Sequence, residues 1–310
     1  MKLINNRYRI VKILEQNRMF SNYIALDMWN KNQKMQLTIL NAEFTPSSLI
    51  DFYSNEFISL INLKSNNIVK NYFFNRVSYI NNKENTKEQY FYTCEYIGRS
   101  KNLLEYIDDM NLFETIDVFI EICKAINYLH LKGYVYGELN LNNIFIIKNN
   151  EDYKVKLNDL ATVELQKNYY TNDKIDNSYF KSPNALTDEN PNREIDIYSL
   201  AVILLTMLRK EISESNPRDE LAVFREELKN NDNNNFTSNE IEYIIQILHI
   251  IKKFITSDEP YDKNYVYGFI SQLNSILDKN YEIFCKKELE KLNFHTKLIG
   301  REDEINSIIK

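Results

Sequence analysis

The chain of 310 residues is 44% hydrophobic and 26% charged, which is enough apolar material to bury one large core or two moderate ones. Lys and Arg number 38 against 44 Asp and Glu, so the net charge is −6, and without a basic stripe we expect no nucleic-acid partner. The five glycines are too scattered to form a phosphate-cradling loop, which excludes a Walker A loop and a Rossmann fingerprint.

The first part of the chain is predicted to be mainly strands. Short β-branched or aromatic stretches separated by polar loops predict strands at Tyr8–Leu14, Asn22–Asp27, Met35–Leu40 and Tyr90–Tyr96. One helical pattern interrupts them, because apolar residues recur at helical spacing from Ser47 to Leu63.

The second part is predicted to be mainly helical. The apolar stripe from Ile116 to Leu129 predicts a helix that ends before Gly133, a residue suited to the left-handed position past a helix end. Three later helices are predicted, at Ile195–Arg209, Asn239–Phe254 (after a capping box at Thr237) and Tyr265–Leu277. Two Asn- and Lys-rich stretches, Asn81–Glu88 and Lys229–Asn235, are expected to be mobile surface loops.

Cysteine and histidine usage, together with hydropathy, bounds the cellular setting. The three cysteines and three histidines lie too far apart for a zinc site. The odd cysteine count and the lack of a signal sequence indicate a reducing compartment. The longest apolar run, Leu200–Leu208, is less than half of the about 20 residues that a membrane-spanning helix needs. We therefore predict a soluble cytoplasmic protein with no zinc and no membrane partner.

Two stretches resemble the catalytic loop and the metal-binding loop of a known enzyme family. Residues 135–145 read VYGELNLNNIF, and Asp159 follows a probable hairpin within KLNDLA. Together they resemble the His-Arg-Asp and Asp-Phe-Gly motifs of the eukaryotic-like (Hanks-type) serine/threonine protein kinases. Further matches in the right order are the first two strands with their turn, the helix C glutamate at Glu56, the hinge at Glu95 and Tyr96, Ser182-Pro183-Asn184 for Ala-Pro-Glu, and the anchoring helix at Asp196.

The resemblance covers about Tyr8 to Leu277 and implies an α+β, bilobal protein-kinase-like fold. It implies a kinase-like domain over residues 1–279, with a β-rich N-lobe of about 1–95 that carries helix C and a mainly helical C-lobe of about 103–277. Asp196 is expected to hold the backbone of the catalytic loop rather than to perform chemistry.

In the nucleotide-binding part, the sequence departs from the family pattern at several positions. The glycines that would let backbone amides approach the phosphates correspond to Glu15, Asn17 and Phe20. The lysine that would hold the α- and β-phosphates corresponds to Thr38, which leaves Glu56 without its partner. The resemblance places three further residues around the nucleotide, namely Cys94, Glu95 and Tyr96; we expect no reactivity of Cys94.

In the catalytic loop, the resemblance implies a mixture of lost and retained groups. Glu138 stands at the position of the base, one methylene longer than aspartate, and Asn140 replaces the lysine that would neutralise the moving phosphoryl group. Asn143 and Asp159 match the two metal-ligating positions and suit Mg²⁺. From the residues alone, Glu138 can equally be a structural carboxylate and Asp159 a turn residue.

Two features of the sequence bear on compensation for the lost groups. Arg18, in the degenerate first turn, could reach toward phosphates in place of the missing lysine, or it could be an exposed loop arginine. The Ala-Pro-Glu glutamate corresponds to Asn184 and its arginine partner to Lys263 or Asn264. Loss of both partners avoids leaving one buried charge unpaired.

Beyond the kinase-like part, residues 280–310 are predicted to be a linker followed by the start of a second domain. The Gly-Arg-Glu stretch at Gly300 resembles the entry to an AAA or signal-type ATPase domain. This implies that the chain is the N-terminal part of a bacterial kinase, ATPase and sensor protein. A tail helix packed on the kinase-like body is the alternative.

Four functions stay open on the sequence. The first is a catalytically impaired pseudokinase that binds ATP and Mg²⁺ weakly and regulates a protein partner or downstream domains of the same chain. The second is a weakly active serine/threonine kinase with Glu138 as base. The third is a ligand-free interaction scaffold, with Met19 and Phe20 folded into the nucleotide site. The fourth is phosphotransfer to a small molecule.

Overall fold

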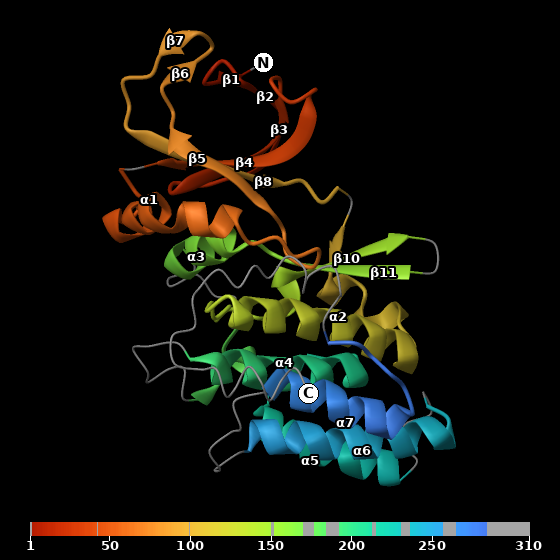
Figure 1. Ribbon diagram of the computed structural model, residues 1–310. Coiled ribbons are helices and arrows are strands. Elements are labelled where there is room, and N and C mark those ends of the chain that lie inside the picture. The colour runs from red at the N-terminus through yellow and green to blue at the C-terminus, as the bar shows by residue number, and fades with distance from the viewer. Residues whose placement is uncertain are drawn as a thin grey trace, which may run out of the picture.

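In a computed structural model the chain folds into two lobes, with the β-rich lobe at the top of Figure 1 and the helical lobe below it. The structure describes residues 2–41, 43–98, 100–149, 152–169, 177–183, 192–212, 215–230, 236–256 and 265–283. The fold is α+β, and the expected fold class is confirmed by the curled sheet of the upper lobe and the helices of the lower one.

The N-lobe is built on one eight-stranded sheet, with strand order β5-β8-β4-β3-β2-β1-β6-β7. The bounds are β1 Leu3–Ile4, β2 Tyr8–Gln16, β3 Phe20–Asp27, β4 Gln33–Asn41, β5 Asn71–Arg76, β6 Tyr79–Ile80, β7 Lys83–Glu84 and β8 Gln89–Glu95. The central strand β4 is buried on both faces from Leu37 to Leu40, because one face meets a separate apolar cluster and the other meets α1 and the C-lobe.

Helix α1 (Ser47–Ile61) lies against the sheet and presents aromatic side chains to it (Figure 1). Tyr53 and Phe57 are buried on its inner face and contact Phe74 of β5 and Tyr92 of β8 through their rings. The helix begins after Pro46, whose fixed φ suits a helix start.

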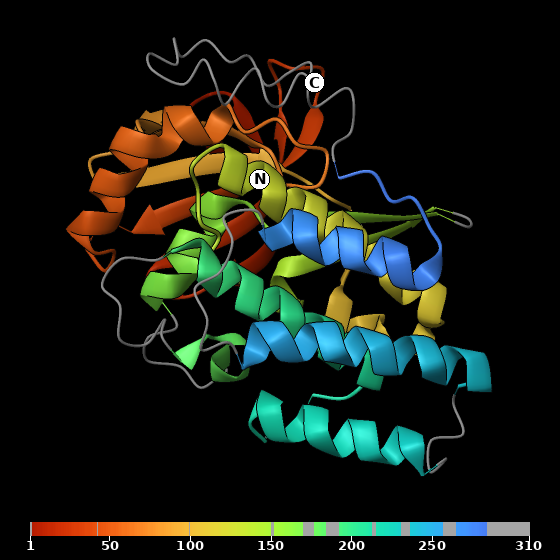
Figure 2. The same ribbon diagram turned by 60° about the horizontal axis from the view of Figure 1, so that its bottom comes forward.

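The C-lobe consists of helices stacked below the cleft. Their bounds are α2 Leu112–Leu131, α4 Arg193–Arg209, α5 Pro217–Lys229, α6 Ser238–Ile255 and α7 Tyr265–Leu277. Helix α4 is buried from Ile195 to Leu208 and contacts both α2 and α6, which makes it the centre of the lobe (Figures 1 and 2). In the described part of the chain no helix is both long and apolar enough to span a membrane.

Between the lobes lie the elements that carry the expected site. A small antiparallel sheet joins β9 (Lys101–Asn102), β10 (Ile144–Asn149) and β11 (Asp152–Leu157). The short turn η3 (Leu141–Asn143) leads from the catalytic loop into β10, and α3 (Leu160–Tyr169) begins one residue after Asp159. Because α3 packs on α1, the segment after Asp159 is tied to the N-lobe.

The structure confirms the predicted order of strands and helices, with ends that differ by a few residues. The capping box at Thr237 is present, and Gly133 has a φ of +84° past the end of α2. The expected loop at Asn81–Glu88 is wrong in part, because Lys83–Glu84 forms the strand β7 of a small hairpin. Helices α3 and α5 were not predicted, and residues 231–235 lie outside the described part.

Candidate functional site

The loop at residues 135–140 is anchored from below by Asp196 of α4. The fully buried carboxylate of Asp196 accepts from the backbone N–H groups of Tyr136 (2.8 Å) and Gly137 (2.7 Å), and His130 Nε2 lies 2.7 Å from its Oδ2. Gly137 has a φ of +74°, a conformation that most side chains disfavour. The prediction that Asp196 holds the loop backbone is therefore confirmed.

Within the loop, two amide side chains are used to hold the loop itself. Asn140 Nδ2 donates to the carbonyl oxygen of Glu138 (2.9 Å), and its Oδ1 accepts from the N–H of Asn142 (3.0 Å). Asn143 Nδ2 donates to the same Glu138 carbonyl (3.0 Å). Asn140 therefore acts as the N-cap of η3, a role for which asparagine is favoured.

The carboxylate at the base position is paired with a cation. Lys181 Nζ lies 2.9 Å from Glu138 Oε1, and the two side chains are 34% and 16% exposed. Lys181 comes from the segment just before Ser182-Pro183, so this ion pair joins that segment to the catalytic loop. Sequence reasoning missed the pair, because no local pattern relates residues so far apart.

Asp159 is fully buried and caps the helix that follows it. Its Oδ1 accepts from the N–H of Thr162 (2.9 Å), and its Oδ2 accepts from Thr162 Oγ1 (2.7 Å). Burial raises the pKa of the Asp159 carboxyl, and hydrogen bonds from Thr162, Cys94 and Asn71 oppose that rise. The carboxylate is thus directed to the start of α3 and the back of the N-lobe sheet.

Two tyrosines of the N-lobe hold α3 in place. Tyr53 Oη of α1 donates to the carbonyl oxygen of Ala161 (2.6 Å), and Tyr92 Oη of β8 lies 3.1 Å from Thr162 Oγ1. Both hydroxyls are buried, and burial raises the pKa of each well above its usual range. Because a buried polar group is costly unless it is paired, these bonds favour α3 in this position.

The structure does not bring Thr38 and Glu56 together. Thr38 is fully buried on β4, where its Oγ1 donates to Asn22 Oδ1 (3.1 Å). Glu56 is exposed on α1, while the inward positions of that helix hold Tyr53 and Phe57. An aromatic cluster therefore occupies the face on which helix C would present its glutamate.

The turn between β2 and β3 uses its own side chain to satisfy its amides. Asn17 Oδ1 accepts from the N–H groups of Met19 (3.0 Å) and Phe20 (2.8 Å), and Asn17 Nδ2 donates to Glu15 Oε1 (3.2 Å). A phosphate binds such a turn through free backbone N–H groups. Two of those groups already have an acceptor here.

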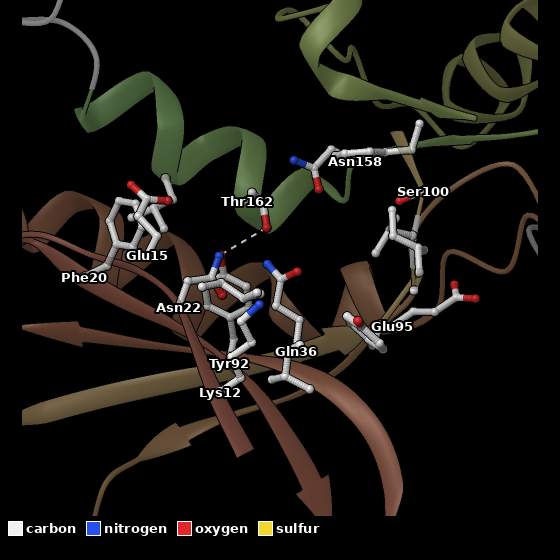
Figure 3. Close-up of a pocket in the computed structure, with 18 residues that line it drawn as sticks. Lys12, Glu15, Phe20, Asn22, Gln36, Tyr92, Glu95, Ser100, Asn158 and Thr162 are labelled. Carbon is white, nitrogen blue, oxygen red and sulfur yellow. Dashed lines mark hydrogen bonds between the residues drawn. The ribbon is translucent and has the colours of Figure 1, made fainter. Parts of the chain in front are cut away.

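A pocket of about 500 Å³ lies between the lobes. Its N-lobe side includes Lys12, Phe20, Asn22, Gln36 and Tyr92, and its other side includes Asn158 and Thr162 (Figure 3). At one end lie the residues of the connecting segment, which are Glu95, Tyr96, Ile97, Gly98 and Ser100. The volume lies within the usual range for small-molecule pockets. Phe20 lines this pocket, whereas Met19 is buried but does not line it.

Of the predicted nucleotide-site residues, the structure brings Glu95 and Tyr96 to the wall of this pocket. The Glu95 carboxylate accepts from Lys156 Nζ (2.6 Å) of β11, so it links the connecting segment to the C-lobe. Cys94 is buried beside Asp159 rather than in the pocket wall, and burial raises the pKa of its thiol. This agrees with the expectation that Cys94 is unreactive.

Arg18 does not face the pocket. Its guanidinium stacks over the ring of Phe44, 4.5 Å from the ring centroid. Among the described residues that line the pocket, the one cation is Lys12. Lys12 of β2 pairs across the sheet with Ile24 of β3, and Ile24 pairs with Gln36 of β4. Because Gln36 is two residues from Thr38 on the same strand, Lys12 lies in the cross-strand row of side chains next to the row that contains Thr38.

Of the two expected magnesium ligands, Asp159 is engaged in hydrogen bonds and Asn143 is held by its amide nitrogen. Both oxygens of Asp159 accept from Thr162, and Asn143 Nδ2 donates to the Glu138 carbonyl, whereas a metal would bind the Asn143 Oδ1. In the described part of the chain, no three His, Cys, Asp or Glu side chains gather where they could hold a metal ion.

Some predicted residues cannot be placed. Asn184, Lys263 and Asn264 lie outside the described residues, and so does the segment 284–310 that carries Gly300. The domain boundary at residue 279 and the second domain therefore stay predictions.

The protein kinase domain family model matches residues 26–282 of this chain. Together with the bilobal fold and the anchored loop, this match shows that the chain belongs to the protein kinase domain family. Protein kinases in general use ATP with Mg²⁺.

Individual relatives are distant. The chain is 22% identical over 218 residues to the probable serine/threonine-protein kinase PknB of Lactococcus lactis, covering 68% of this chain and 33% of that protein. It is 27% identical over 128 residues to human 3-phosphoinositide-dependent protein kinase 1, covering 39% of this chain and 22% of that protein. The chain thus spans a third or less of the length of these relatives.

Solved structures show the same fold. The Mycobacterium tuberculosis PknI kinase domain aligns with a TM-score of 0.60, at 11% identity over 88% of this chain and 97% of that chain. A double mutant of the same domain aligns with a TM-score of 0.58. The likeness concerns the fold alone.

Proposed function

We propose that this kinase domain is a catalytically impaired pseudokinase that binds a nucleotide weakly, without a metal ion, and regulates a protein partner or further domains of its own chain. The observation that carries the proposal is the position of Asp159. A carboxylate that caps α3 and is fully buried is not available to hold a metal ion against phosphates.

Three further observations support the loss of chemistry. The lysine position holds buried Thr38, the amides of the first turn are occupied by Asn17, and Asn140 is used within its loop. Phosphoryl transfer depends almost entirely on positioning and electrostatic stabilisation. Losing several stabilising groups together therefore lowers the rate by many orders of magnitude, while the pocket of about 500 Å³ keeps room for a ligand.

A phosphotransfer assay tests this proposal. The full chain is incubated with γ-labelled ATP, Mg²⁺ or Mn²⁺ and a general protein acceptor, beside the variant Glu138→Gln. The proposal predicts equal labelling of the two proteins at background level. Labelling of the wild-type chain that Glu138→Gln abolishes would overturn it.

A weakly active serine/threonine kinase is the second candidate. One observation favours it: the Glu138 carboxylate is 16% exposed and is held in the loop beside Lys181 at 2.9 Å, so a carboxylate and a cation remain where the hydroxyl acceptor would bind. For this candidate, labelling falls in Glu138→Gln and in Lys181→Ala, but not in Arg18→Ala, because Arg18 stacks on Phe44.

A further inference from the structure

A second pocket, remote from the interlobe pocket, lies between α5 and α6 at the far end of the C-lobe. The two helices lie side by side, and Figure 2 shows them at the end of the lobe opposite the N-lobe sheet. The pocket has a volume of about 190 Å³, and its apolar floor includes Leu221 and Ile255. Nothing in the proposed function uses it.

The rim of this pocket carries three cations, from Arg218, Arg225 and Lys252. The acid on the rim, Glu226, is already bonded by Lys229 at 2.7 Å, and that bond lowers the pKa of the Glu226 carboxyl. Within the described part of the chain, no ion pair within 4.0 Å joins Arg225 or Lys252 to an acid, although the charge of Arg225 also lowers the pKa of the Glu226 carboxyl. A protein with a net charge of −6 thus holds a local excess of positive charge here.

Helix electrostatics explain only part of this excess. Lys252 lies in the last turn of α6, where a cation complements the helix dipole. Arg218 lies in the first turn of α5, where a cation is unfavourable, although its Nε donates to the carbonyl oxygen of Ile255 (3.3 Å). Arg225 lies mid-helix with neither benefit. The cluster is therefore not accounted for by the stability of its own helices.

The spacing of the cations indicates what they would bind. Arg218 and Arg225 are two turns apart on one face of α5, about 10 Å along its axis. Carboxylates two to four residues apart on an extended segment are about 7 to 13 Å apart, whereas one phosphate group is much smaller.

Beside the pocket, an adjoining hollow is lined by Ala222, Val223, Glu226, Glu227 and Asn230. Val223 is 51% exposed there, so an apolar side chain also has a place. The two acids of this hollow are each within 4 Å of a cation, Glu226 with Lys229 (2.7 Å) and Glu227 with Arg209 (3.6 Å).

We propose that the pocket between α5 and α6 docks an extended acidic segment of a partner protein, with carboxylates on the three cations and one apolar side chain beside Val223. Exposed charge pairs contribute modestly to affinity and depend on salt. The site is therefore expected to bind weakly and to be strongest at low ionic strength. Its existence does not depend on the state of the interlobe pocket.

The test is fluorescence anisotropy with the full chain and a short fluorescein-labelled peptide that carries several glutamates and one leucine. A peptide with glutamines in place of the glutamates serves as the ligand control. The variant Lys252→Glu is compared with Lys253→Glu, its neighbour outside the pocket, because both change the charge equally in the same turn of α6. Circular dichroism checks that both variants are folded.

The proposal predicts that the acidic peptide binds and its glutamine version does not. Lys252→Glu and Arg225→Glu each weaken binding about fivefold or more, and Lys253→Glu by less than about twofold. Equal effects of Lys252→Glu and Lys253→Glu would overturn the proposal, since they indicate a general charge effect. Full displacement by inorganic phosphate, but not by sodium chloride of the same ionic strength, would also overturn it in favour of a small-anion site.

Discussion

Two regions of the domain differ in how many of the hydrogen bonds and residue types expected from the kinase pattern they retain. One is the anchor, formed by Asp196 beneath the catalytic loop, and the other is the roof, the N-lobe side of the interlobe pocket around Asn17 and Thr38. Beneath the loop, Asp196 holds the N–H groups of Tyr136 and Gly137 and contacts His130. In the roof, Thr38 stands at the lysine position and Asn17 occupies the turn amides. The anchor stabilises the fold, whereas in protein kinases the corresponding roof positions hold the phosphates of the nucleotide, so the two regions can change independently.

Asp159 stands between these two regions and shows how one residue can change roles. Its position in the fold is that of a metal ligand, but its hydrogen bonds are those of a helix N-cap. A residue that is identical to the family pattern can thus have hydrogen-bond partners that the pattern does not predict. The two regions therefore differ in bonding geometry as much as in residue identity.

The largest expected effect tests the anchor. Asp196→Ala removes a fully buried carboxylate and leaves two backbone N–H groups and His130 without their acceptor. We expect a loss of about 3–5 kcal/mol in the free energy of unfolding, measured by urea denaturation. Glu226→Ala, at an exposed acid, should change it by about 0.5 kcal/mol or less; equal effects would refute the anchoring role.

The next effect tests the attachment of α3. Thr162→Val removes the Oγ1 that donates to Asp159 and contacts Tyr92, and hydrogen bonds to charged groups contribute about 1.5–3 kcal/mol. We expect Thr162→Val to lower the free energy of unfolding by about 2 kcal/mol and the backbone amides of α3 to exchange their hydrogens faster. Thr206→Val, which removes a neutral bond to Val202 within α4, should cost about 1 kcal/mol or less, and a reversed order would contradict the account.

The smallest effect concerns pH and lies outside both regions. Arg7 bonds Asp27 in two places, at 2.6 and 2.9 Å, and this holds the pKa of the Asp27 carboxyl below its usual value. Because the folded pKa is lowered, the pair stabilises the fold above the unfolded pKa of about 3.9. That stability is lost as the pH falls through the lower, folded pKa.

We expect Asp27→Asn to lower the free energy of unfolding by about 1–2 kcal/mol at neutral pH. The loss is modest because the Arg7 side chain is 27% exposed, so that solvent partly screens the ion pair. The difference between the wild type and Asp27→Asn should shrink as the pH is lowered from about 5 to below 3. Urea denaturation at several pH values measures it. If the difference in free energy of unfolding between the wild type and Asp27→Asn stays constant with pH, the charge of the Asp27 carboxylate does not contribute to stability.

Much of the fold was predictable from the sequence, because hydrophobic periodicity and motif order are local signals. The role of Asp196 followed from its motif, and the start of α6 followed from the capping box at Thr237. Helix α5 could have been found too, since Asn216 and Pro217 form a typical helix start. These features depend on neighbours within a few residues.

The site was less predictable because it depends on contacts between distant segments. Helix α3 was missed because Asp159 was assigned to the family's metal loop, although an Asp before a helix is a common N-cap. Lys12 could be placed in the pocket only once the register of β2 was known, and that strand has two irregularities in its pairing with β3. The pair of Glu138 and Lys181 joins residues that no local pattern relates.

The most direct test of the central claim is a thermal-unfolding series with ATP and ADP, each with and without Mg²⁺, on the wild type and on Asp159→Asn. A ligand at about one hundred times its dissociation constant stabilises the folded state by about 2.7 kcal/mol. The account predicts that the nucleotide raises the unfolding temperature and that Mg²⁺ does not increase this rise. The rise, measured from the unfolding temperature of each protein without nucleotide, is the same for the wild type and for Asp159→Asn. A shift that requires Mg²⁺ and disappears in Asp159→Asn would contradict it.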